Sequence, residues 1–129
     1  MSFAKASLLI SSIWGIWHTP LILMGHNYPQ HQQFGVIMMI IWCVLLTPII
    51  IYFTIKSKSV IAAAILHGTM NATATISNMQ VSGGNDLTVG LTGAAGLIAM
   101  TVLILGIFIY DTYISRENIM LNQINMFVK

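Results

Sequence analysis

Four long apolar segments, separated by short polar linkers, constrain the fold more than any other feature of this sequence. They cover residues 3–24, 34–55, 59–79 and 89–110. A hydrocarbon core of roughly 30 Å is crossed by about 20 apolar residues in an α-helix, so each segment is long enough to span a membrane. We therefore predict an all-α fold, a polytopic transmembrane helical bundle with about four spanning helices.

Composition supports an integral membrane protein in contact with lipid. Hydrophobic residues make up 57% of the chain and charged residues 6%, whereas soluble domains carry about a quarter charged residues. The chain has five basic residues, too few to neutralise several phosphates, which argues against nucleic-acid binding. Cys43 is the only cysteine, so an intrachain disulfide and a cysteine-based zinc site are both excluded.

The basic residues predict the orientation of the helices. With four spans, they all fall on one side of the membrane: Lys5, Lys56, Lys58, Arg116 and Lys129. Short cytoplasmic loops collect Lys and Arg during insertion, so both termini are predicted to be cytoplasmic. Residues 116–129 are expected to form a cytoplasmic tail that either lies on the membrane surface or frays. The two opposite loops contain His26, His31 and Asp86, and we expect both histidines to be solvated and inert.

The first segment carries a histidine that lipid alone would not accommodate. Ser11, Trp14 and His18 are spaced by three and four residues, so a helix places them on one face. Pro20 follows, and its ring displaces the carbonyl of Ile16, which predicts a free acceptor near the imidazole. Irregular backbone at this depth is tolerated only against protein or a water-filled cavity.

A second polar face lies on the third segment. His67 and Asn71 are four residues apart, and Thr75 and Asn78 extend the same stripe. One interpretation is that these groups only hydrogen-bond between helices and stabilise the bundle. The other is a functional site, in which His18 and His67 approach each other across one cavity. Ionisable groups inside a membrane favour the functional interpretation.

Two chemical schemes suit two imidazoles and an amide. His18 and His67 can share a divalent metal such as zinc, which needs at least one further ligand. Alternatively, one imidazole and a carboxylate activate water, while the other imidazole and Asn71 stabilise the oxyanion. Both schemes require a carboxylate at the depth of the histidines. The three carboxylates of the chain all fall in loops or in the tail: Asp86, Asp111 and Glu117.

These two polar segments resemble motifs of the CPBP family of intramembrane proteases, also called the ABI or CAAX-protease-like family. "SSIWGIWHTP" is similar to the second motif of the family, with Trp14 at the aromatic position and His18 as the histidine. "SVIAAAILHGTMNA" is similar to the third motif, His-x-x-x-Asn, and gives His67 and Asn71. The resemblance extends from Ser11 to Tyr110 and includes the short basic loop and the final Gly-rich helix.

The resemblance implies an intramembrane endopeptidase that hydrolyses a peptide bond in a peptide or prenylated-protein substrate. In the family, a glutamate of a Glu-Glu-x-x-x-Arg motif and the histidine matching His18 activate water. The residues matching His67 and Asn71 hold the oxyanion. As a metalloprotease, the site would bind its metal through His18 and His67, with Trp14 packed beside them. Family members also include bacterial proteins linked to bacteriocin immunity, which implies a bacterial cell membrane.

This chain contains no Glu-Glu-x-x-x-Arg motif. We therefore expect residues 1–115 to be the C-terminal part of a protease domain whose earlier helices carry the glutamates, and the isolated chain to be inactive. The alternative is a non-catalytic membrane protein that acts in bacteriocin self-immunity or binds a partner helix. A transporter fragment with a histidine proton relay ranks last, because the chain has neither internal repeats nor an intramembrane carboxylate.

Overall fold

A computed structural model describes residues 1–80 and 82–124, and of residues 75–80 it describes the backbone alone. The elements in chain order are α1 (Phe3–Trp17), α2 (Thr19–Leu23), α3 (Gln32–Ser57), α4 (Val60–Gln80), α5 (Ala94–Ile109) and the π-helix η1 (Tyr110–Ile114). Within the described ranges there is no strand, and a single isolated β-bridge pairs Ser2 with Gln123. The predicted all-α class and helical membrane bundle are confirmed.

Three helical stretches are long and apolar enough to cross a membrane: Phe3–Leu23, Gln32–Ser57 and Ala94–Ile114. In α4, the apolar stretch among the described residues is shorter and covers Val60–Ala74. Asn71 and its threonine neighbours make this helix the most polar of the long ones. Thr75 and Asn78, which the sequence placed on the same stripe, lie outside the described side chains.

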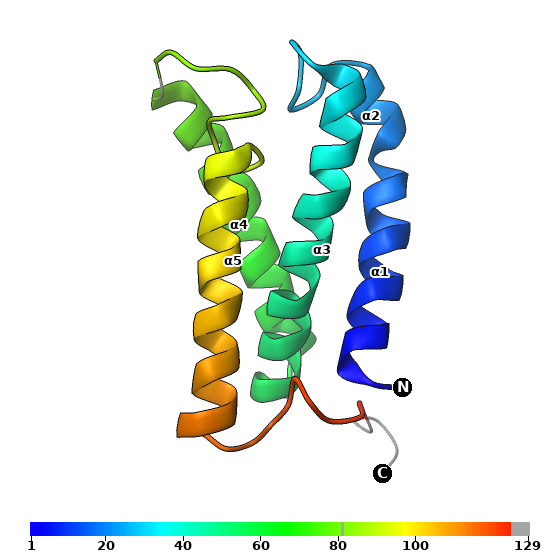
Figure 1. Ribbon diagram of the computed structural model, residues 1–129, viewed down its shortest axis with the longest axis vertical. Helices are drawn as coiled ribbons and strands as arrows, with labels where there is room; N and C mark the ends of the chain where they lie inside the picture. Colours follow the sequence, from blue (N-terminus) through cyan, green and yellow to red (C-terminus); the bar gives the residue numbers. More distant parts are fainter. Residues whose placement is uncertain (81, 125–129) are drawn as a thin grey trace.

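The central helix of the bundle is α3, which contacts α1, α2, α4 and α5 (Figure 1). Its buried side chains form most of the core: Met39, Trp42, Cys43, Leu46, Ile49 and Tyr52. Among the described residues, the backbone of α1 does not closely approach that of α4 or α5, whereas both α4 and α5 lie close to α3. The outer helices are therefore positioned by a shared partner, which leaves room between α1 and α4.

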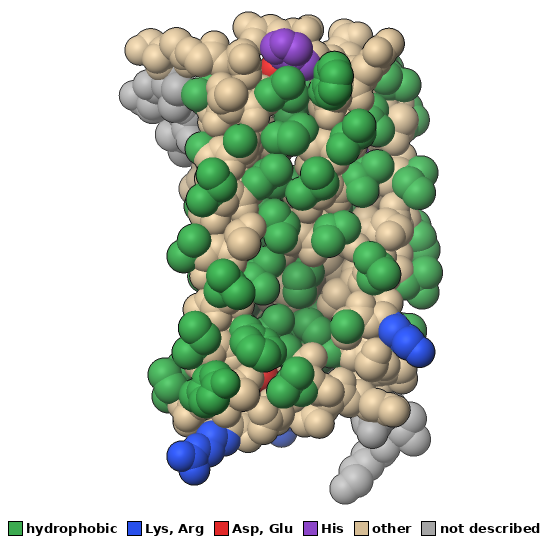
Figure 2. Space-filling view, viewed as in Figure 1, with side chains coloured by type: hydrophobic (Ala, Val, Ile, Leu, Met, Phe, Trp, Pro, Cys, Tyr) green, Lys and Arg blue, Asp and Glu red, His purple; other side chains and the backbone are tan. Residues whose placement is uncertain are grey.

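The two ends of the bundle differ in charge. The beginning of the chain, the turn between α3 and α4, and the segment after η1 lie together at the lower end in Figure 1. Lys and Arg side chains gather toward this end, His side chains appear at the other, and hydrophobic side chains cover the surface between them (Figure 2). The structure thus separates the basic residues from the loop histidines as the sequence predicted, and Lys129 lies outside the described residues.

The segment after η1 pairs with the start of the chain. The Phe3 N–H donates to the Asn122 carbonyl at 3.2 Å, and the Ile124 N–H donates to the Met1 carbonyl at 2.9 Å. Lys56 and Glu117 form an ion pair of 2.6 Å at the same end. The described part of the expected tail, up to residue 124, is thus hydrogen-bonded against the bundle.

The fourth helix begins later than the sequence predicted. We expected it to start at residue 89, but α5 starts at Ala94, with Gly93 as its N-cap. Gly90 has a φ of +80°, a conformation outside the helical region. Residues 82–93 therefore form a loop at the end opposite the basic residues.

Candidate functional site

His18 is the junction between α1 and α2, where the sequence had predicted one continuous helix. Its N–H donates to the Gly15 carbonyl at 3.2 Å, one residue closer than in an α-helix, so the Trp14 carbonyl loses its usual partner. His18 Nδ1 lies 2.8 Å from that carbonyl oxygen. The acceptor beside the imidazole is therefore the Trp14 carbonyl, and the prediction that it would be Ile16 was wrong.

This contact determines the tautomer of His18. A carbonyl oxygen only accepts hydrogen bonds, so Nδ1 carries the proton in the neutral imidazole and Nε2 keeps its lone pair. The same bond fixes the ring orientation, as hydrogen bonds to the distal nitrogen of functional histidines do. His18 can accept a proton, or bind a cation, through Nε2.

His67 and Asn71 lie one turn apart on α4, as their spacing predicted. The Asn71 Nδ2 atom is 3.3 Å from His67 Nε2, and as placed the amide donates to the imidazole. The His67 side chain is partly exposed and that of Asn71 is exposed. Both side chains are therefore accessible to a molecule between α1 and α4.

Trp14 connects the two histidines. Its ring centroid is 5.6 Å from that of His18 and 5.3 Å from that of His67, which it meets edge-on at 83°. Trp42 of α3 supports Trp14 at a centroid distance of 5.8 Å. The predicted polar faces of the first and third segments thus converge on one aromatic ring.

The converging side chains line one cavity of about 670 Å³, within the usual size range of small-molecule sites. The lining consists of Trp14, Trp17, His18, His26, Asn27, Met39, Trp42, His67, Asn71, Ala74, Leu91 and Thr92. The prediction that His18 and His67 share one cavity is confirmed. The lining also includes all three tryptophans of the chain.

Sequence reasoning missed two histidines at the loop end. His26 was expected to be solvated and inert, but it is part of the cavity lining. Gly25 ends α2 with a φ of +92°, its N–H donates to Ile22, and the His26 N–H donates to Leu21 at 3.0 Å. This C-terminal cap turns the chain back toward the cavity. In the sequence, the signal for such a cap is the Gly-His pair directly after an apolar run.

His31 was also expected to be inert, but it pairs with Asp86.

The three carboxylates of the chain are all among the described residues, and none lines this cavity. Asp86 is paired with His31, and Glu117 with Lys56. Asp111 is fully buried and accepts a hydrogen bond from the Met120 N–H at 3.0 Å. As the sequence predicted, no carboxylate of this chain lies beside the two histidines.

The described residues do not form a complete metal site. Residues 1–80 and 82–124 contain no group of three His, Cys, Asp or Glu side chains arranged to hold a metal ion. His18 and His67 provide two imidazoles, whereas a catalytic zinc site uses three protein ligands and one open position. A zinc ion bound by His18 and His67 would therefore need a further ligand from outside this part of the chain.

Comparison with known proteins identifies a family. A family model described as type II CAAX prenyl endopeptidase Rce1-like matches residues 1–73, which is more than half of the 129 residues. The matched region contains Trp14, His18, His67 and Asn71, and ends two residues beyond Asn71. No curated protein and no solved structure matches the chain.

Proposed function

The chain belongs to the Rce1-like family of type II CAAX prenyl endopeptidases, and we propose that its cavity is the hydrolytic site of a CAAX-protease-like enzyme. The substrate is a prenylated protein or peptide, and the reaction is attack of activated water on a peptide carbonyl. The observation that carries the proposal is the convergence of His18, His67 and Asn71 on one cavity. The proposed location is a bacterial cell membrane with the basic end in the cytoplasm.

In this proposal His18 is the general base. Its Nδ1–H is held by the Trp14 carbonyl at 2.8 Å, so Nε2 is the nitrogen that takes a proton from water. Histidine is the side chain that most often acts as a general acid or base in enzymes. Trp14 keeps the His18 ring in place through a tilted ring contact and through its carbonyl.

His67 and Asn71 are proposed to stabilise the oxyanion of the tetrahedral intermediate. Because His67 Nε2 accepts from the Asn71 amide, the imidazole donates through Nδ1–H. This N–H and an amide N–H of Asn71 are the two donors proposed for the substrate carbonyl oxygen. Fixed donors of this kind favour the transition state because they need no reorganisation during the reaction. The 3.3 Å contact between Asn71 and His67 holds both groups in register before substrate enters.

The scheme needs a carboxylate beside His18. Each carboxylate of the chain is engaged away from the cavity, in two ion pairs and one buried hydrogen bond. We therefore propose that a helix bearing a glutamate, which these 129 residues do not contain, packs between α1 and α4 and completes the site. The chain by itself is expected to be inactive.

The proposal is tested by mass-spectrometric detection of the peptide released from a prenylated substrate, using the protein in its native membrane. His18→Ala and His67→Ala should each abolish release while expression remains normal. Thr101→Val, which changes an exposed residue of α5 outside the cavity lining, is the control and should cleave like the wild type. Near-normal turnover by either histidine variant would refute the assignment.

A further inference from the structure

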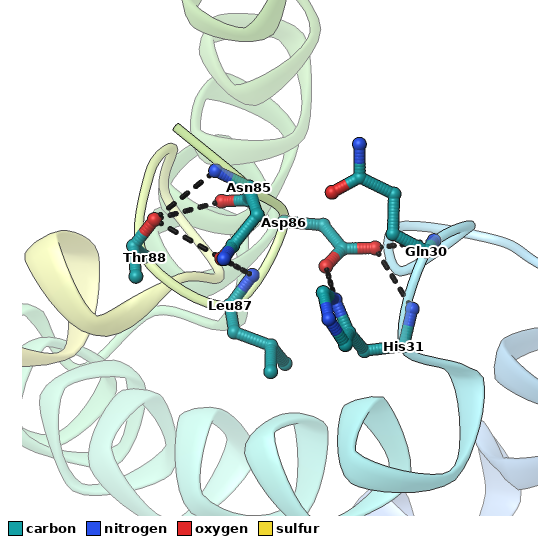
Figure 3. A network of polar contacts seen from close by, with 6 residues as sticks. All are labelled: Gln30, His31, Asn85, Asp86, Leu87 and Thr88. Atoms are coloured by element: carbon teal, nitrogen blue, oxygen red, sulfur yellow. Dashed lines mark hydrogen bonds and ion pairs between the residues drawn. The ribbon is translucent and has the colours of Figure 1, made fainter. Parts of the chain in front are cut away.

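Two loops at the end opposite the basic residues are joined by an ion pair. Asp86 Oδ1 lies 2.6 Å from His31 Nδ1, linking loop 82–93 to the end of loop 24–31. Asp86 Oδ2 accepts hydrogen bonds from the backbone N–H groups of Gln30 at 2.6 Å and His31 at 3.3 Å. Figure 3 shows the carboxylate facing these three donors. A single side chain therefore ties two segments that are 55 residues apart.

The Asp86 side chain is presented by a turn that is already ordered. The Leu87 N–H donates to Asn85 Oδ1 at 3.1 Å, and the Thr88 hydroxyl donates to the Asn85 carbonyl at 3.1 Å (Figure 3). The Asp86 side chain is 8% exposed and that of His31 is 38% exposed. The pair is thus partly shielded from solvent on the carboxylate side and reachable on the imidazole side.

A second contact joins the same two loops. Tyr28 is fully buried, and its hydroxyl donates to the Thr92 carbonyl at 2.7 Å. Its ring packs on Gly35 of α3, where an added Cβ would lie 2.5 Å from the Tyr28 side chain. Loop 24–31 is therefore fixed both to α3 and to loop 82–93.

These contacts are adjacent to the cavity lining. His26 and Asn27 of one loop, and Leu91 and Thr92 of the other, all line the cavity that contains His18 and His67. Thr92 is both a lining residue and the acceptor for Tyr28. The distance between the two loops therefore determines how wide the cavity opens at the end that the loops form.

We infer that Tyr28, His31 and Asp86 form a rim clasp, a set of positioning residues that controls access to the cavity from its loop side. The inference depends on the cavity and the loop contacts, and not on the reaction proposed for the cavity. Loss of the clasp lets His26 and Asn27 separate from Leu91 and Thr92. Water and polar molecules then reach the tryptophans and histidines of the lining more readily.

Charge favours a closed clasp at neutral pH. Burial raises the pKa of the Asp86 carboxyl, but hydrogen bonds from His31 and from the Gln30 N–H lower it further than burial raises it, so the net pKa is below its usual range. Burial raises the pKa of Tyr28 to about 12, so its hydroxyl remains a donor. The other titratable group in these loops is His26, and neither loop contains Lys or Arg.

Tryptophan fluorescence tests the rim clasp directly, because all three tryptophans of the chain line the cavity. In bilayer nanodiscs, Asp86→Asn and His31→Ala should raise the acrylamide quenching constant and shift the emission to the red. Tyr28→Phe removes only the hydroxyl and should move both readings in the same direction.

The control is Glu117→Gln, which removes an ion pair of equal length, 2.6 Å, at the opposite end of the bundle. It should leave quenching unchanged. A wild-type quenching constant in folded Asp86→Asn and Tyr28→Phe proteins would overturn the inference. Lowering the pH through the Asp86 pKa should raise quenching in the wild type and not in Asp86→Asn. Equal responses of the two proteins would also contradict the rim clasp.

Discussion

At the scale of the residue, His18 and His67 were identifiable from sequence because ionisable groups are costly in an apolar segment. Their spacing to Trp14 and Asn71 also gave the correct helix faces. The tautomer of His18 could not be predicted, because it depends on which carbonyl the junction leaves unpaired. Here that carbonyl belongs to Trp14, and its bond to Nδ1 leaves Nε2 as the basic nitrogen.

Asn71→Ala tests the role assigned to the amide. If Asn71 donates to the oxyanion, its removal should lower kcat by about 10²–10³ and leave KM nearly unchanged, because the donor acts mainly in the transition state. The measurement is steady-state release of the cleaved peptide from native membranes. Equal changes in kcat and KM, or a drop in expression matching the lost rate, would point to a structural role instead.

At the scale of the element, the sequence predicted the helices better than it predicted their ends. The spans could be predicted from the length of each apolar segment, because the thickness of the bilayer sets the length that every segment needs. The interruption at His18 and the late start of α5 depend on local hydrogen bonding and on the positive φ of Gly90. The tie between Asp86 and His31 joins loops 55 residues apart, so no local periodicity could reveal it.

Gly35→Ala tests how tightly loop 24–31 is docked on α3. The added Cβ would lie 2.5 Å from Tyr28, and overpacking of this kind should destabilise the protein by about 1–3 kcal/mol. The measurement is thermal unfolding in detergent, followed by circular dichroism. Gly106→Ala is the matched control, because a Cβ there meets nothing within 4 Å and Ala favours a helix over Gly by about 0.5–1 kcal/mol. A stability of Gly35→Ala equal to that of the control would contradict the docking.

At the scale of the whole molecule, two sets of contacts position the cavity. The side chains of α3 pack against the outer helices, and the contacts between loops 24–31 and 82–93 fix the end of the bundle beside the cavity. Because Asp86 is ionisable, the stability that the contacts between the two loops provide depends on pH. Because the folded-state pKa of Asp86 is lowered, its contribution to stability is present above the unfolded-state pKa. The contribution is lost as the pH falls through the lowered folded-state value.

The expected outcome is a loss of thermal stability in acid that depends on Asp86. Unfolding temperatures measured from neutral pH down through the carboxyl range should fall more steeply for the wild type than for Asp86→Asn. The variant should be less stable than the wild type at neutral pH, and the difference should narrow in acid. Parallel curves for the two proteins would show that Asp86 does not contribute in this way.

Cysteine crosslinking measures directly whether α1 and α4 meet at one cavity. In a Cys43→Ser background, the pair His18→Cys and His67→Cys should be joined within one chain by a short bifunctional thiol reagent in native membranes. The control pair, Ile16→Cys with His67→Cys, places the first thiol on an exposed part of α1 outside the lining and should remain unlinked. Efficient linking of the first pair alone is the predicted result. Failure to link it, or equal linking of both pairs, would contradict the shared site.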